Sequence, residues 1–165
     1  MVNLAQFRKH VQDNSPAFVP LFKDQSRYQV AWGGAGSGKS HIVARKWLYR
    51  ILKEDDFQHK ILVTRKVNRT IKRSVFTLLK NIISRWGLYD DFEFNLTDLT
   101  ITYKQNGSQF LFTGMDDPEK LKSIEGITGI FMEEATEFSQ EDFEQLDLRL
   151  RGVTKYVKQM TLTLN

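Results

Sequence analysis

The chain has 165 residues, no cysteine, and 24 Lys and Arg against 20 Asp and Glu, which gives a net charge of +4. Its 41% hydrophobic content predicts one domain with a buried core, and no run reaches the ~20 apolar residues needed to span a bilayer. Without cysteine, disulfides and thiolate metal sites are excluded, and the three histidines are scattered, so we expect any metal to bind oxygen ligands. The charge is compatible with nucleic-acid contact but too small to indicate a dedicated binding arm. The first residues show no export-signal pattern, which predicts an intracellular location.

The most informative stretch follows a predicted buried strand at 28–32. It is a phosphate-binding loop in which eight residues are in register with the pattern: Gly33, Gly34, Ala35, Gly36, Ser37, Gly38, Lys39 and Ser40. Glycine lets successive backbone N–H groups point at a polyphosphate, and the helix that follows directs its positive end toward the same anion. We expect Lys39 to bridge the β- and γ-phosphates and Ser40 to bind Mg²⁺. Apolar residues at helical spacing support that helix: Ile42, Val43, Trp47, Leu48 and Ile51.

Aromatic residues precede the loop. Phe18, Phe22 and Tyr28, with Gln25 and Arg27, could form a wall for an adenine base or could belong to the core. The residues themselves leave both alternatives open.

A second strand is predicted at 60–65 and a helix at 68–86, where apolar residues recur at helical spacing. In the connecting basic stretch, Lys66, Arg69 and Arg73 can share a helical face. They could contact DNA phosphates or form a solvated helix face. Short strands at 92–94, 100–103 and 109–112, with a turn at Asn106–Gly107, indicate a local antiparallel excursion.

A short apolar run at 130–132 predicts a central strand that ends at Glu133 and Glu134. Ligands bind at the carboxyl ends of strands in open parallel sheets, so this position suits catalysis. We expect Glu133 to hold Mg²⁺ and Glu134 to activate the attacking water, and a pair of acids favours hydrolysis over binding alone. The alternative is a pair of solvated charges at a strand end.

Ser139 and Asp142 fit a helix-start box, and the helix is expected to run to about Leu150 before a core strand at 160–164. Arg149 and Arg151 would then lie on nearly opposite helix faces, so at most one could approach a γ-phosphate. Arg149 could be catalytic or an ordinary surface residue, and Lys120 and Lys122 are rival cations.

The alternation of strands and helices predicts an α/β P-loop NTPase fold, with a twisted, mainly parallel sheet flanked by helices and a small antiparallel insertion. No linker or repeat divides the chain.

Four features together resemble the ATPase domain of the terminase large subunit, the DNA-packaging motor of tailed bacteriophages. They are the loop at 33–40, the strand-end residues Glu133-Glu134-Ala135, the stretch at 116–122 that precedes the acidic strand, and the terminal stretch at 161–165. The resemblance implies Mg²⁺-dependent ATP hydrolysis that powers translocation of double-stranded viral DNA into a procapsid, in the cytoplasm of the host. It also implies a homo-oligomeric ring, a terminase small subunit and a portal protein as partners, and no membrane contact. The last strand resembles the family's coupling motif, so Asn165 would sense the γ-phosphate, and Lys122 is the nearest match to a basic residue that precedes the acidic strand.

Two positions depart from the family pattern. Ala35 stands where many terminases carry an arginine, and Glu133 replaces the more usual aspartate. Residues 1–165 are expected to form an N-terminal ATPase domain, a fragment of a longer chain without the C-terminal nuclease domain, so no nuclease activity is expected. Two other functions stay open: a nucleotide-binding assembly or switch module without efficient hydrolysis, and another DNA-dependent ATPase such as a helicase.

Overall fold

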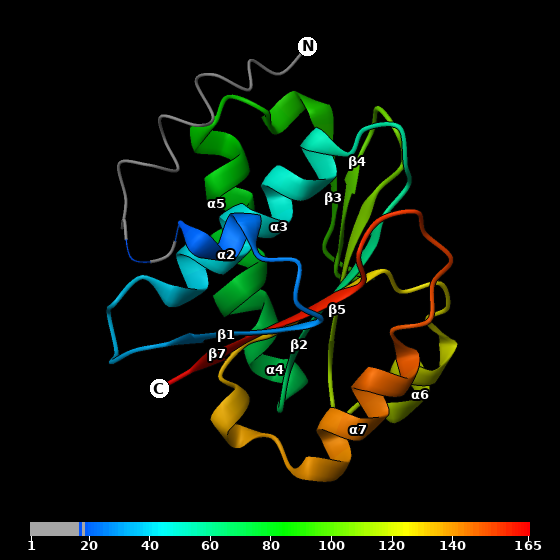
Figure 1. The fold of residues 1–165 in the computed structure, drawn as a ribbon. Helices are drawn as coiled ribbons and strands as arrows, with labels where there is room; N and C mark the ends of the chain where they lie inside the picture. The colour runs from blue at the N-terminus through cyan, green and yellow to red at the C-terminus, as the bar shows by residue number, and fades with distance from the viewer. Residues whose placement is uncertain (1–16, 18) are drawn as a thin grey trace.

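The fold is taken from a computed structural model that describes residues 17 and 19–165. Phe18, one of the aromatic residues considered for an adenine wall, lies outside the described residues. Within them, one seven-stranded sheet has the strand order β1-β7-β6-β2-β5-β4-β3 (Figure 1). Five strands run parallel: β1 (Tyr28–Trp32), β7 (Gln159–Leu164), β6 (Gly129–Met132), β2 (Lys60–Arg65) and β5 (Gln109–Gly114). The two others, β4 (Thr100–Tyr103) and β3 (Phe92–Asn95), extend the sheet in antiparallel fashion.

Helices cover both faces of this sheet (Figure 1). On one face lie α3 (Lys39–Lys53) and a second run made of α4 (Asn68–Ile71), η2 (Lys72–Phe76) and α5 (Thr77–Arg85). On the other lie α6 (Pro118–Ser123) and α7 (Gln140–Arg149). The remaining short elements are α2 (Pro20–Lys23), η3 (Tyr89–Asp91) and η4 (Ala135–Glu137). The predicted α/β class with a mainly parallel sheet is therefore confirmed.

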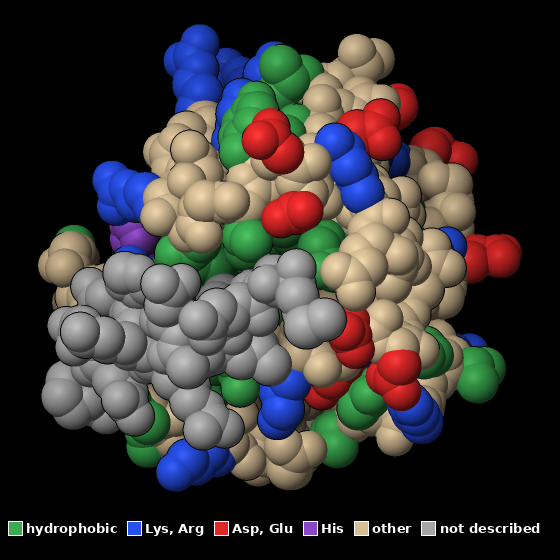
Figure 2. All heavy atoms as spheres, turned by 90° about the horizontal axis from the view of Figure 1, so that it is seen from above, with side chains coloured by type: hydrophobic (Ala, Val, Ile, Leu, Met, Phe, Trp, Pro, Cys, Tyr) green, Lys and Arg blue, Asp and Glu red, His purple; other side chains and the backbone are tan. Residues whose placement is uncertain are grey.

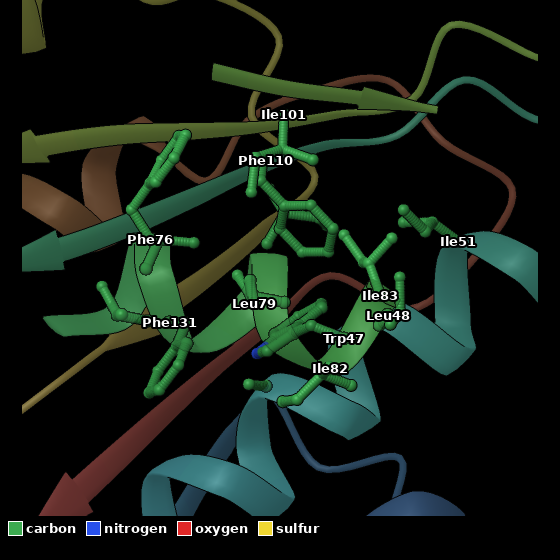
Figure 3. Close-up of a cluster of buried hydrophobic side chains, with 14 of the residues drawn as sticks. Trp47, Leu48, Ile51, Phe76, Leu79, Ile82, Ile83, Ile101, Phe110 and Phe131 are labelled. Carbon is green, nitrogen blue, oxygen red and sulfur yellow. The ribbon is translucent and has the colours of Figure 1, made fainter. Parts of the chain in front are cut away.

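Two apolar layers form the core because strand residues alternate between the faces. On β2, Ile61 and Val63 pack against the α3 side, whereas Leu62 packs against the α6–α7 side. Figure 3 shows the larger layer, where Trp47 of α3, Leu79 of α5 and Phe110 of β5 meet over the sheet. Trp47 is fully buried, and it packs so closely on β6 that a side chain at Gly129 would collide with its ring.

The helix predicted at 68–86 is present but not uniform. Its central turn, η2, is a π-helix, and α-helix continues on both sides of it. Lys66 precedes the first turn, so it cannot share a helical face with Arg69 and Arg73. Ile71, Val75, Leu79 and Ile82 are all buried, as their spacing predicts.

The strand predicted at 28–32 is present, but the prediction that it is buried is wrong. β1 lies at the edge of the sheet with β7 as its neighbour, and only alternate residues face α3. Val30 and Trp32 are 53% and 76% exposed, whereas Tyr28, on the same side of β1, packs against Phe143 of α7.

The antiparallel excursion is continuous with the main sheet rather than separate from it. The predicted turn joins β4 to β5, with Gly107 at φ 73° and the Tyr103 N–H donating to the Ser108 carbonyl at 2.8 Å. Beyond this turn, β5 pairs in parallel with β2 as well as antiparallel with β4.

The predicted start of α7 is confirmed as a capping box. The Ser139 side chain accepts from the Asp142 N–H, and the Asp142 carboxylate accepts from the Ser139 N–H. The helix ends at Arg149, however, so Arg151 lies beyond it, and the expected arrangement of both arginines on one helix is wrong.

A buried polar seam joins α3 to β7. Lys46 donates to the Thr161 hydroxyl at 2.9 Å and to the Gln29 side chain, while Arg50 donates to the Gln159 side chain at 3.3 Å. Burial, reinforced by the nearby Arg50 charge, lowers the pKa of Lys46 from 10.5 to about 7. Asp24 and Glu54 act in the opposite direction.

This seam predicts a pH dependence of stability. A lysine with a lowered pKa adds stability that is complete above its ordinary pKa near 10.5 and is lost as the pH falls to about 7. We expect the free energy of unfolding to rise between these values, because the unfolded chain then holds the proton that folded Lys46 has released. The rise should be on the order of 4 kcal/mol and absent in Lys46→Met, where Thr161 and Gln29 still bond to each other. Urea unfolding of both proteins across this pH range measures it, and parallel curves would contradict it.

On the described part of the face seen from above, side chains of both charge signs are present. There, Lys and Arg side chains are interspersed with Asp and Glu, beside a strip of hydrophobic side chains (Figure 2). Among the described residues, no helix is both long and apolar enough to span a membrane.

Candidate nucleotide site

The carboxyl ends of four neighbouring parallel strands bring the candidate residues to one edge of the sheet. The glycine-rich loop follows β1, Asn165 follows β7, Glu133 and Glu134 follow β6, and Arg65 ends β2. A single strand, β7, separates the loop from the acids, a spacing of ~10 Å. Residues more than 90 positions apart in the chain thus converge.

The loop has the backbone shape that its glycines permit. Gly36 and Gly38 have φ values of 75° and 85°, which side chains disfavour, and α3 begins directly afterwards at Lys39. The Lys39 ammonium is buried and donates to the Gly34 carbonyl at 2.9 Å and to the Asn165 side chain at 2.6 Å. These bonds hold the lysine across the concave side of the loop.

A pocket of about 260 Å³ lies between the loop and Glu134, and Glu133 is not among the residues that line it. Its wall comes from the loop residues 35–40 together with His41, Glu134, Thr163 and Asn165. The loop and Glu134 therefore face one space, as the sequence predicts, and Asn165 closes it from β7. The sequence did not predict that His41 lines this pocket.

Glu134 reaches the pocket through an unusual backbone conformation. Its φ and ψ are 55° and 52°, a left-handed geometry that costs a non-glycine residue about 1–2 kcal/mol. The Thr163 hydroxyl accepts from the Glu134 N–H at 3.1 Å, and the Glu134 carbonyl accepts from the Glu137 N–H at 3.0 Å. The bond to Thr163 of β7 stabilises this strained backbone conformation. The Glu134 side chain consequently faces the pocket, whereas the Glu133 side chain is buried.

Glu133 has the character of a metal ligand. It is 6% exposed, and burial raises the pKa of its carboxyl, against the lowering effects of Arg65 and of hydrogen bonds from Ser40 and Ser74. Its Oε2 is buried without a hydrogen-bond partner. An unsatisfied carboxylate oxygen beside a serine hydroxyl fits a hard cation such as Mg²⁺, which takes few protein ligands and completes its shell with water and phosphate. Among the described residues, no group of three or more acids or histidines is arranged so that it could hold a metal ion by itself.

Arg65 is the site residue that the sequence did not reveal. Its guanidinium forms an ion pair with Glu134, and its Nε lies 3.5 Å from the Glu133 Oε2. One cation thus lies beside both acids and offsets part of the repulsion between them. In the sequence Arg65 is only the first residue of a basic stretch, and no local signal separates it from Lys66.

Three predicted cations do not line this pocket. Lys122 and Arg149 border a different pocket between α6 and α7, where the Arg149 guanidinium donates to the Lys122 carbonyl at 3.4 Å. Lys120 donates to the Asp98 carbonyl at 2.7 Å. The structure does not bring Arg149 or Lys122 to the loop, and their catalytic role stays a prediction.

The expected adenine wall is not gathered at this pocket either. Arg27 and Tyr28 bind the Asp147 carboxylate at 2.7 and 2.9 Å, while Phe22 and Gln25 line a separate pocket beside α3. In the basic stretch, Lys66 pairs with Asp142 at 2.5 Å, whereas Arg69 and Arg73 are exposed.

Comparison with known proteins gives close sequence relatives. The family model described as "Phage terminase large subunit" matches residues 25–165. The PBSX phage terminase large subunit of Bacillus subtilis (strain 168) is 37% identical over 142 residues, which cover 86% of this chain and 32% of that protein. The terminase large subunit of Bacillus phage SPP1 is 32% identical over 136 residues, covering 78% of this chain and 32% of that protein. The chain thus spans about a third of the length of these curated relatives.

A solved structure shares the fold. The large terminase of a thermophilic bacteriophage, in complex with ATP-γ-S, superposes with a TM-score of 0.66 at 18% identity, covering 96% of this chain and 37% of that one.

Proposed function

Because the chain belongs to the phage terminase large subunit family, we propose that it hydrolyses ATP with Mg²⁺ to drive double-stranded viral DNA into a procapsid. One observation carries the proposal: the phosphate-binding loop and Glu134 line the same pocket, with Lys39 and Asn165 between them. The similar terminase bound to ATP-γ-S supports a nucleotide as the ligand.

The roles of the residues follow from their positions. Backbone N–H groups of residues 34–40 bind the phosphates, and the start of α3 adds its positive end. Lys39 neutralises charge that develops on the transferred phosphoryl group, and Asn165 senses the γ-phosphate through its contact with Lys39. Glu134, at the open side of the pocket, orients a water and accepts its proton.

Ser40 and Glu133 would hold the magnesium ion. When bound, the ion neutralises phosphate charge and stabilises the leaving group. Glu133 must be ionised for this, and Arg65 favours that form against the effect of burial.

The proposal extends to the complete motor. Residues 1–165 would be its N-terminal ATPase domain, without nuclease activity, acting in the host cytoplasm as part of a homo-oligomeric ring. Double-stranded DNA, a terminase small subunit and a portal protein would be its partners.

A second candidate is a nucleotide-dependent assembly or switch module without efficient hydrolysis. The ion pair between Arg65 and Glu134 favours it, because a carboxylate held by a guanidinium is a weaker base.

Phosphate release with and without double-stranded DNA separates the two. We expect phosphate release that depends on Mg²⁺ and increases when DNA is added, whereas nucleotide binding without phosphate release would favour the switch module.

Lys39→Ala should weaken ATP binding by at least about 30-fold, because a buried charge-assisted contact to phosphate is lost. Titration with a fluorescent ATP analogue measures this, and Lys104→Ala, an exposed lysine on the β4–β5 turn, is the matched control. Equal affinities in both variants would refute the role of Lys39.

A further inference from the structure

A second pocket of about 260 Å³ lies at the amino end of β7, along the second half of α3. Four basic side chains line it, Lys46, Arg50, Lys53 and Lys155, against one carboxylate, Glu54. From Lys39 to Arg50, α3 advances ~16 Å, so this pocket is distinct from the nucleotide site.

The positive charge in this pocket is only partly compensated, because Lys155 pairs with Asp56 but Lys46 and Lys53 have no carboxylate in contact among the described residues. Glu54 is already engaged, since its carboxylate lies 3.0 Å from the Arg50 Nε and 2.8 Å from the His59 ring. Lys46 is buried and donates to the neutral side chains of Gln29 and Thr161. A buried ammonium without a carboxylate in contact is stabilised by any anion that enters nearby.

Donors for such an anion are present. The Arg50 guanidinium uses three of its five N–H groups, on Glu54, Gln159 and the Val157 carbonyl, and two remain. Lys53 is exposed and forms no ion pair among the described residues, and its ammonium lies 6.0 Å from the Tyr49 ring centroid.

The remaining wall is aromatic. Phe22 of α2 packs edge-on against Tyr49 of α3 at 5.9 Å, and Tyr156 contributes from the loop before β7. These rings are half-buried, and their apolar surface lowers the local dielectric and strengthens the electrostatic attraction of the cations.

We propose that this second pocket binds a phosphate group, with Lys53 and Arg50 donating to its oxygens and Lys46 adding positive charge behind them. The phosphate could belong to a free anion such as pyrophosphate or to a DNA strand, and the experiment distinguishes these sources.

The test titrates the 165-residue protein with inorganic pyrophosphate by calorimetry. Because the phosphate-binding loop also attracts anions, the titration is done in a Lys39→Ala background, where the second pocket should still bind. Adding Lys53→Glu should weaken that binding about tenfold or more, corresponding to the loss and reversal of one charge contact. Lys104→Glu reverses a charge outside the pocket and should leave the affinity unchanged. Both lysines are exposed, so neither change should prevent folding.

Two results would overturn the proposal: no pyrophosphate binding in Lys39→Ala, or equal affinities in the two charge reversals. A short DNA duplex then identifies the source. Displacement of pyrophosphate by the duplex, lost in Lys53→Glu, assigns the pocket to strand phosphates, and no displacement assigns it to a free anion. Hydrolysis of ATP is not measured at any step, so the outcome is independent of the proposed function.

Discussion

Replacing Glu134 with glutamine is expected to slow hydrolysis by several orders of magnitude while ATP still binds. Glutamine keeps the size and polarity of the side chain but cannot accept the proton of the attacking water. A general base contributes about 10²- to 10⁴-fold to the rate, and we expect a loss of that size. Binding should persist, because Glu134 lies 38% exposed at the rim of the pocket, away from the phosphate contacts of the loop.

Single-turnover phosphate release and nucleotide titration, done side by side, measure both effects. Glu93→Gln is the matched control: it makes the same chemical change at an exposed position on β3 that does not line the pocket. Near-normal turnover in Glu134→Gln, or an equal loss in both variants, would show that Glu134 is not the base.

The phosphate-binding loop could be predicted from the sequence because its residues are themselves the site. Gly36 and Gly38 take positive φ, and Lys39 begins α3, as the pattern requires. The acids could be placed for a similar reason, since an apolar run that ends in Glu133 and Glu134 predicts a strand with polar residues at its carboxyl end.

The neighbours of each strand could not be predicted in this way. The run at 160–164 predicts a strand, but nothing in it shows that β7 lies between β1 and β6. That position gives Thr163 its bond to the Glu134 N–H and Asn165 its bond to Lys39. The edge position of β1 escaped prediction for the same reason, because an apolar pentapeptide looks alike at the edge and in the centre of a sheet.

Arg65 shows the limit most clearly. The parallel pairing of β2 with β6 places Thr64 opposite Met132, so the next residues, Arg65 and Glu133, lie beside each other. This contact joins residues 68 positions apart and depends on strand register, which the local sequence does not encode.

Arg65→Ala is expected to lower ATP hydrolysis about 10- to 100-fold near neutral pH, through the acids rather than through the nucleotide. Removing the guanidinium leaves Glu133 and Glu134 without their shared cation. The pKa of the Glu133 carboxyl, already raised by burial, should rise further, because a nearby opposite charge normally favours the ionised form. Protonated Glu133 cannot hold magnesium, so activity should be lost at low pH and recovered as the pH rises.

The measurement is the pH profile of kcat/KM at fixed magnesium, for the unmodified protein, Arg65→Ala and Arg65→Lys. We expect the acidic limb of the alanine variant to move to higher pH. The lysine variant, which keeps the charge, should stay close to the unmodified profile. A defect of folding would instead lower activity equally at every pH. An unshifted acidic limb in Arg65→Ala would therefore show that Arg65 does not set the ionisation of the acids, and its contact with Glu134 would then restrain only the position of that side chain.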